Sequence, residues 1–198
     1  MKDTIVGFAM CGSFCTFDAA IKALEKLCGL YKTVVPVMSE NAYHTDSRFG
    51  FAADFNALVE KFCGRRIINS ITEAEPIGPN ALLDILVIAP CTGNTLAKIA
   101  HGVADTSVTM SAKAHLRNGR PLLIAISTND ALSGNAANLG SLLVRKNVYF
   151  VPFYQDDPTG KPASLTADLN KLPSAIDAAL EGRQMQPVFT CSDGQKQV

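Results

Sequence analysis

The sequence of 198 residues contains no tryptophan, and only 7% of its residues are aromatic. Charged residues make up 18%, and 18 basic side chains are balanced by 18 acidic ones. This balance disfavours a general nucleic-acid surface, because phosphate binding needs clustered positive charge. Its hydrophobic fraction is 47%, which excludes disorder because disordered chains bury too little apolar surface to fold. We therefore predict a folded protein that does not bind nucleic acid.

Long apolar runs are also missing. The uncharged stretches 4–17 and 85–97 are shorter than the roughly 18 residues that a membrane-spanning helix needs. The N-terminus lacks the small-residue cleavage pattern of a signal peptide. We therefore expect no membrane attachment and a cytoplasmic location.

The cysteines show neither a Cys-x-x-Cys pair nor histidines at zinc-site spacing, so no metal site is predicted. Most are typical of small buried hydrophobic residues in a reducing cytosol. Cys11, Cys15 and Cys91 stand apart because they lie in or beside polar loops. The six positions are Cys11, Cys15, Cys28, Cys63, Cys91 and Cys191.

Apolar runs typical of strands alternate with amphipathic stretches typical of helices along the whole chain. Strands are predicted at 4–10, 32–38, 66–68, 84–89, 122–127 and 148–153, and helices at 17–28, 51–62, 94–101, 105–118, 135–146 and 173–181. Parallel strands need crossovers that place helices on both faces of the sheet. The pattern therefore predicts a three-layer α/β/α Rossmann-like fold with a six-stranded parallel sheet.

One domain is predicted over residues 1–189, followed by a polar tail at 190–198, because no linker long enough to separate domains is present. The low charge and high apolar content suit a surface that other copies of the chain partly cover. We therefore expect a homo-oligomer.

The carboxyl ends of parallel strands are where such sheets bind ligands, at the point where strand order reverses. The loops 11–16, 39–48, 90–95 and 127–135 follow predicted strands and carry most clusters of Ser, Thr, Asn and Gly. This coincidence predicts a small-molecule site.

The first of these loops offers Gly12, Ser13 and Phe14 before a helix. Glycine lets a backbone approach a ligand closely, and a helix N-terminus favours an anion. The loop matches neither the Gly-x-Gly-x-x-Gly dinucleotide fingerprint nor a Walker loop. A plain tight turn is the alternative.

The loop 89–95 reads APCTGNT and follows the most apolar predicted strand. Thr92, Asn94 and Thr95, with the free N–H groups of the next helix, make a site for a phosphate without Lys or Arg. A simple N-cap by Thr92 or Asn94 would explain one residue but not the whole run.

The other two loops give less specific candidates. Asn129 can hydrogen-bond a ligand ring or make an Asx turn. His44 and Arg48 flank Asp46, and a loop holding both could meet an acidic substrate, although a lone surface histidine is the commoner case.

The run 89–95 resembles the Pro-Ala-Ser-Ala-Asn-Thr motif of the homo-oligomeric flavin-containing cysteine decarboxylases, and Gly12-Ser13 resembles their first flavin-phosphate loop. Pro90, Asn94 and Thr95 match the motif. Cys91, Thr92 and Gly93 differ from it. The resemblance implies FMN held between protomers. Taken together with the donors of the polar loops, it predicts these FMN-binding residues: Gly12, Ser13, Phe14, Ser39, Cys91, Thr92, Gly93, Asn94, Thr95 and Asn129.

Two departures disfavour cysteine decarboxylation. Residues 71–79 contain no counterpart of the catalytic histidine of those enzymes. Their Pro-x-Met-Asn-x-x-Met-Trp motif is represented only by Asn129 in the run 127–130.

Over residues 4–189 the chain resembles the family of dipicolinate synthase B subunits, on the runs 39–50 (SENAYHTDSRFG), 126–132 (ISTNDAL) and 180–189 (LEGRQMQPVF). The resemblance implies a cytoplasmic oxidoreductase subunit of an endospore-forming bacterium that acts during sporulation. A second polypeptide, the A subunit of dipicolinate synthase, would supply NAD(P), and a small dicarboxylate heterocycle of the dihydrodipicolinate pathway would become dipicolinate.

His44 and Arg48 are the predicted catalytic residues for that reaction. Arg48 stays protonated and can clamp a carboxylate, and His44 has a reference pKa near neutrality. Two alternatives stay open. One is a flavin-dependent decarboxylase-like or prenyl-transfer enzyme, and the other is a non-catalytic scaffold that organises the A subunit.

Overall fold

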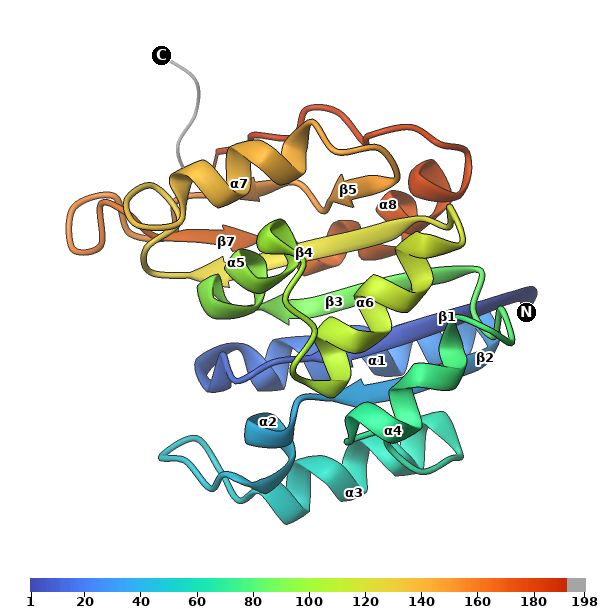
Figure 1. Ribbon diagram of the computed structural model, residues 1–198. Coiled ribbons are helices and arrows are strands. Elements are labelled where there is room, and N and C mark those ends of the chain that lie inside the picture. Colours follow the sequence, from blue (N-terminus) through green and yellow to red (C-terminus); the bar gives the residue numbers. More distant parts are fainter. Residues whose placement is uncertain (192–198) are drawn as a thin grey trace.

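The computed structural model describes residues 1–191 and has three layers (Figure 1). Helices α1 (Phe17–Leu30) and α8 (Leu172–Leu180) cover one face of a central sheet. Helices α5 (Gly93–His101), α6 (Ser107–Arg117) and α7 (Ala136–Leu143) cover the other face. The predicted α/β/α fold is therefore confirmed.

The sheet has a parallel core in the order β2-β1-β3-β4, with β5 beside β4. These strands are β1 (Lys2–Met10), β2 (Tyr31–Met38), β3 (Ile85–Cys91), β4 (Leu122–Thr128) and β5 (Val148–Phe150). Every residue of β3 is buried, as expected for a strand covered on both faces. Strand order reverses at β1, which pairs with β2 on one side and β3 on the other.

The strands differ from the prediction in three places. Residues 66–68 supply only an isolated bridge between Val37 and Ile68. The predicted strand 148–153 is split into β5 and β6 (Phe153–Tyr154), because Pro152 has no N–H with which to continue the ladder. The short strand β7 (Leu165–Ala167) was not predicted, and it pairs antiparallel with β6 and with the end of β4. The sheet is therefore mostly parallel and seven-stranded rather than six-stranded.

Several helix ends coincide with capping residues that the sequence supplies. Helix α3 (Ala52–Cys63) ends at Gly64, whose φ is 64°, a conformation that favours glycine. The short helix α2 (Glu40–His44) lies inside a segment predicted to be a loop, and the Ser39 side chain accepts a hydrogen bond from the Ala42 N–H. The remaining short elements are α4 (Ile71–Ala74) and three 3₁₀ turns, η1 (Phe14–Thr16), η2 (Glu75–Ile77) and η3 (Leu169–Lys171).

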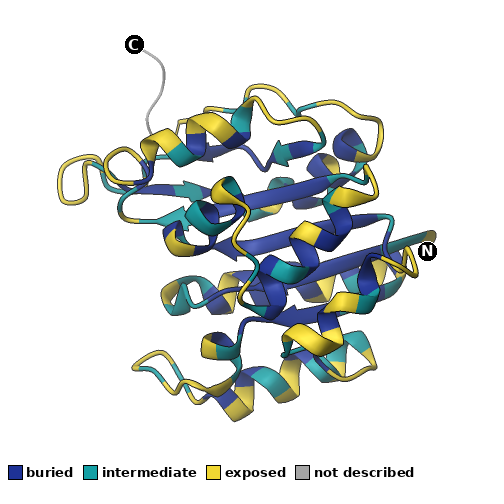
Figure 2. Ribbon diagram, viewed as in Figure 1, coloured by how far each residue is buried: buried dark blue, intermediate teal, exposed yellow. Residues whose placement is uncertain are grey.

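Buried residues run along the strands and the inner faces of the helices (Figure 2). None of the helices in the described part of the chain is long and apolar enough to cross a membrane. Of the predicted tail 190–198, Thr190 donates its N–H to Phe153 O over 2.9 Å. Residues 192–198 lie outside the described residues.

Candidate functional site

Three of the predicted loops meet at one edge of the sheet. The Cys11 N–H donates to Pro90 O over 3.3 Å, which joins the loop after β1 to the end of β3. The hydroxyl oxygens of Ser13 and Ser127 lie 3.0 Å apart, which joins the same loop to the end of β4. The prediction that polar loops converge where strand order reverses is therefore confirmed.

Two adjoining pockets open at this edge. The Ser13 pocket, of about 340 Å³, is lined by residues 12–16, 127–129 and 164–166 with Arg48, Phe49, Thr92, Asp156 and Lys161. The Thr95 pocket, of about 470 Å³, is lined by Cys11, Gly12, Phe14, residues 39–41, Thr92, Asn94, Thr95, Lys98, Asp105 and Thr106. Both pockets share Gly12, Phe14 and Thr92. Their volumes lie within the roughly 300–1,000 Å³ range of small-molecule sites.

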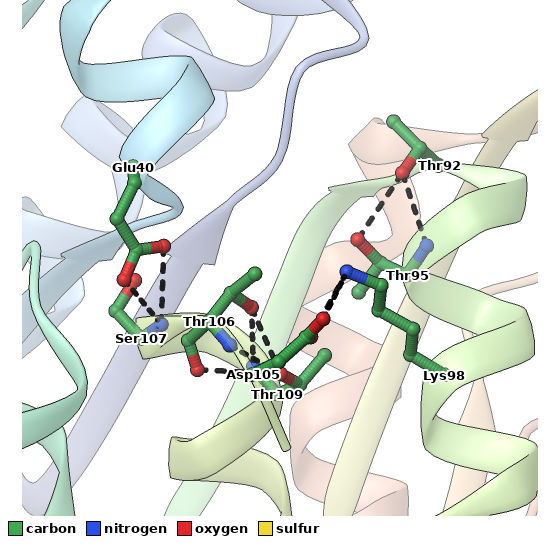
Figure 3. A network of polar contacts seen from close by, with 8 residues as sticks. All are labelled: Glu40, Thr92, Thr95, Lys98, Asp105, Thr106, Ser107 and Thr109. Atoms are coloured by element: carbon green, nitrogen blue, oxygen red, sulfur yellow. Dashed lines mark hydrogen bonds and ion pairs between the residues drawn. The ribbon is translucent and has the colours of Figure 1, made fainter. Parts of the chain in front are cut away.

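The N-terminus of α5 supplies free donors to this region. Thr92 is the N-cap, and its side chain accepts from the Thr95 N–H and donates to Thr95 Oγ1 over 3.1 Å (Figure 3). The N–H groups of Gly93 and Asn94 have no acceptor among residues 1–191. Asn94 lines the Thr95 pocket. Free N–H groups at a helix N-terminus favour an anion, as predicted for this loop.

Gly93 is buried and lines neither pocket. A Cβ there would lie 2.5 Å from Asp130 Oδ1, 2.6 Å from Asn135 Nδ2 and 2.7 Å from Thr128 Oγ1. These groups form a network, because Asp130 accepts from Thr128 over 2.6 Å and from Asn135 over 2.7 Å. The missing side chain thus lets the loop after β4 pack against the first turn of α5.

Part of the wall of the Thr95 pocket is formed by polar groups that bind one another or neighbouring residues (Figure 3). Lys98 Nζ lies 2.9 Å from the Asp105 carboxylate, and this hydrogen bond lowers the pKa of Asp105. The Glu40 carboxylate accepts from the Ser107 N–H over 3.1 Å at the start of α6. Thr106, the N-cap of α6, forms a capping box with Thr109. The one lysine in this wall is therefore already paired.

The Ser13 pocket carries two cations from separate loops, Arg48 and Lys161. Arg48 has no carboxylate within 4.0 Å in the described chain, and its guanidinium carbon lies 4.9 Å from the centre of the Phe49 ring. Lys161 Nζ lies 3.5 Å from Asp156. Burial alone would raise the pKa of Asp156, but a hydrogen bond from Ser164 and the charge of Lys161 lower it on balance.

Lys161 was missed by sequence reasoning. One feature of the sequence could have identified it. Lys161 lies in the loop after the last predicted strand, 148–153, and the carboxyl end of that strand faces the same edge of the sheet as the other polar loops. That loop carries no cluster of Ser, Thr, Asn and Gly like those that single out the other four loops. Its residues return to the sheet through β7, which was itself not predicted.

Two buried cysteines at this edge of the sheet, Cys11 and Cys91, are not suited to nucleophilic chemistry, whereas the exposed Cys15 lines the Ser13 pocket. Cys11 lines the Thr95 pocket, and burial raises its pKa to about 11. Cys91 is fully buried in β3, and burial raises its pKa well above the usual value. Both therefore stay protonated at neutral pH, whereas the thiolate is the reactive form.

The structure brings most of the predicted cofactor residues together. Those that line one or both pockets are Gly12, Ser13, Phe14, Ser39, Thr92, Asn94, Thr95 and Asn129. Cys91 and Gly93 line neither pocket. Of the predicted catalytic pair, Arg48 lines the Ser13 pocket, whereas His44 is exposed at the end of α2 and lines neither pocket. The His44 ring instead packs edge-on at 4.9 Å from the Tyr43 ring.

Comparison of the chain with known proteins identifies one family. A family model described as Flavoprotein matches residues 1–169. The B subunit of dipicolinate synthase of Bacillus subtilis (strain 168) is 44% identical over 189 residues, which are 96% of this chain and 94% of that protein. The crystal structure of the B subunit of dipicolinate synthase from Bacillus halodurans C has a TM-score of 0.86 at 43% identity, covering 94% of this chain and 96% of that chain.

A more distant likeness extends to a decarboxylase. The FMN-dependent cysteine decarboxylase SpaF has a TM-score of 0.65 at 24% identity, covering 90% of this chain and 95% of that chain. At this identity the likeness shows a shared fold.

Proposed function

The chain belongs to the Flavoprotein family, and we propose that it acts as the B subunit of a dipicolinate synthase. The observation that carries this proposal is the 44% identity to such a protein across 96% of this chain. In this function the chain works in the cytoplasm with a separate nicotinamide-binding polypeptide, the A subunit. That partner supplies NAD(P), and a small dicarboxylate heterocycle is converted to dipicolinate.

FMN fits the residues of the two pockets. The Ser13 hydroxyl lines the Ser13 pocket, and the Asn94 N–H, which has no acceptor among residues 1–191, lies at the Thr95 pocket, so neutral donors suit a phosphate. At Gly12 an added Cβ would meet only the Phe14 ring, at 3.5 Å, so the backbone is open to a ligand. Phe14 and Asn129 line the Ser13 pocket, and we assign them to the flavin ring. When bound, FMN supplies a redox centre.

Arg48 and Lys161 are the residues that we assign to the substrate. Arginine stays protonated and can hold a carboxylate through two hydrogen bonds, and lysine provides a point charge. The two cations come from different loops of one pocket. Arg48, which has no acidic partner in the described chain, can hold one carboxylate of a dicarboxylate, and Lys161 can hold the other if it exchanges its pair with Asp156, which is 3.5 Å away. His44 remains our candidate acid–base residue, four positions before Arg48.

The test uses the full chain reconstituted with the A subunit. We expect the visible spectrum of a flavin in the purified chain. We expect Arg48→Ala and His44→Ala each to lower dipicolinate formation on the order of a hundredfold, with folding unchanged because both side chains are exposed. Cys11→Ala is the matched control and costs little activity. Dipicolinate formation at wild-type rates when this chain is left out would overturn the proposal.

One observation favours a second candidate, a non-catalytic scaffold for the A subunit. None of the three histidines lines either pocket, and the Cys11 thiol is protonated at neutral pH. The two candidates differ in their response to substitution. If the chain is a scaffold, Arg48→Ala and His44→Ala support wild-type rates in the reconstituted pair, and loss of the chain itself still lowers the rate.

We also propose that residues 1–189 form a single domain and that the chain forms a homo-oligomer. Low charge supports this proposal, as do exposed apolar side chains such as Val144, which is 86% exposed, and Phe51, which is 64% exposed. Light scattering would refute it by giving only the 21.1 kDa monomer mass at micromolar concentration.

A further inference from the structure

A third pocket, of about 290 Å³, lies between helices α5 and α6 and Arg145, which follows α7 closely. We call it the basic pocket. It is lined by Ile99, Gly102, Val103, Thr109, Ala112, Lys113, Leu116, Arg117 and Arg145. Helices α5, α6 and α7 lie on the same face of the sheet (Figure 1). The basic pocket is lined by residues at the C-terminal end of α5, whereas the Thr95 pocket is lined by residues at its N-terminal end. These ends are separated by a nine-residue helix, roughly 13 Å long at the α-helical rise.

The basic pocket combines an apolar interior with cations that have no acidic partner. No carboxylate lies within 4.0 Å of Lys113, Arg117 or Arg145 in the described part of the chain, although seven other cations do form such pairs. Lys113 and Arg117 are four residues apart on α6, a spacing at which like charges repel. An apolar cleft lined by one sign of charge concentrates ions of the opposite sign.

Arg145 is held in place at this pocket. Its Nη1 donates to Ile99 O, one of the last carbonyls of α5, over 3.0 Å. A guanidinium has five N–H donors, so the others remain available to a ligand. This hydrogen bond keeps the guanidinium of the exposed Arg145 side chain beside the pocket.

We propose that the basic pocket binds a small organic anion, an aromatic or heteroaromatic carboxylate of one ring. Ile99, Val103 and Leu116 offer apolar contact to the ring, and an arginine can hold a carboxylate through two hydrogen bonds. The volume lies at the lower end of the range for small-molecule sites and suits one ring rather than a nucleotide. A pyridine dicarboxylate belongs to this class, so on the proposed function, on which this choice of ligand rests, the product itself is a ligand.

Calorimetric titration with dipicolinate tests the proposal in the Arg48→Ala chain, so that the Ser13 pocket contributes little. We expect saturable binding that falls at least tenfold in affinity with Lys113→Ala plus Arg117→Ala. Leu116→Trp places a larger side chain in the pocket and should abolish dipicolinate binding. Lys146→Ala is the matched control, since Lys146 is exposed and does not line the pocket, and it should leave the affinity unchanged.

Three results would overturn the proposal. Equal affinity in the double variant would show that the ligand binds elsewhere. Equal affinity for the neutral diamide of dipicolinate would show that charge is not recognised. A shift of oligomeric mass in the double variant without any loss of dipicolinate binding would show an interface instead. Because the titration uses this chain without its partner polypeptide, failure of the proposed function would leave this test valid.

A second inference rests on Cys28 in α1 and Cys63 in α3. Their Sγ atoms lie 4.0 Å apart, and both residues are partly exposed. The hydrogen bond between them lowers the pKa of Cys28 and raises that of Cys63. Cys28 therefore loses its proton more readily than Cys63, and a thiolate is the attacking species in thiol–disulfide exchange. Neither cysteine was singled out in the sequence.

We infer that Cys28 and Cys63 form a reversible disulfide with a small-molecule disulfide as oxidant. The Cys28 thiolate attacks one sulfur of the oxidant and releases one thiol. Cys63 then loses its proton and attacks Cys28 Sγ, releasing the second thiol. Two protein thiols are oxidised, and one disulfide is reduced to two thiols.

Mass spectrometry of the folded chain in glutathione buffers tests this inference. We expect the loss of two hydrogens, mapped to a Cys28–Cys63 peptide and reversed by reduced glutathione. In Cys63→Ser we expect a stable glutathione adduct on Cys28. The exposed Cys15 is the internal control, and oxidation of Cys15 with Cys28 and Cys63 still reduced would overturn the inference.

Discussion

Replacing Gly93 with alanine tests whether the loops after β3 and β4 pack together as the structure shows. The added Cβ would lie within 2.7 Å of Thr128 Oγ1 and nearer still to Asp130 Oδ1 and Asn135 Nδ2. Overpacking costs about 1–3 kcal/mol, and each hydrogen bond of the network that breaks adds about 0.5–1.5 kcal/mol. We therefore expect Gly93→Ala to lower the free energy of unfolding by about 2–4 kcal/mol.

Urea unfolding followed by circular dichroism measures this loss, which corresponds to a midpoint lower by about 1 M or more for an ordinary m-value. Gly140→Ala is the matched control. No atom lies within 4 Å of the corresponding Cβ in α7, and alanine in a helix interior gains about 0.5–1 kcal/mol over glycine. If Gly93→Ala were as stable as the wild type while Gly140→Ala gained stability, the network would not pack against α5.

The remaining predictions concern pH and helix caps. Burial lowers the pKa of His115 to about 4, and its Nε2 lies 3.0 Å from Pro121 O. In the unfolded chain the pKa of this histidine is about 6.5, so the free energy of unfolding is not reduced by His115 above pH 6.5. The free energy of unfolding falls by up to about 3 kcal/mol as the pH drops to 4, because the unfolded chain takes up a proton that the folded chain does not. In urea titrations at several pH values, His115→Gln should flatten this dependence. Thr106→Ala removes the N-cap of α6 and should cost about 1 kcal/mol; an unchanged thermal midpoint would contradict the capping box. Glu40→Gln weakens the charge-assisted bond to the Ser107 N–H, so it should lower the midpoint by less than Thr106→Ala does.

The composition and the apolar periodicity determined the fold class and the position of the site. An apolar run such as 84–89 is buried on both faces wherever it lies in a parallel sheet, so its local pattern is enough to predict β3. The loops at the carboxyl ends of such strands meet at one edge by topology alone. That is why Ser13, Thr92 and Asn129 could be assigned to one site without coordinates.

Only the tertiary structure decided which side chains of those loops face the pockets. Arg48 and His44 are four residues apart in one polar segment, yet Arg48 alone lines the Ser13 pocket. The segment holds an unpredicted turn of helix, α2, whose N-cap is Ser39, and this turn sets the direction of its side chains. Local periodicity does not encode such directions.

Contacts between distant segments were beyond the sequence for a different physical reason. Cys28 and Cys63 are 35 residues apart in the sequence. Gly93 packs against the hydrogen-bond network of Asp130, which lies in the loop after β4. Hydrophobic patterning specifies which face of an element is buried, but it does not specify which residue of another element lies opposite it. That pairing is set by how the helices and loops pack, and so the thiol pair, the packing role of Gly93 and the unpaired cations of the basic pocket emerged only in the folded chain.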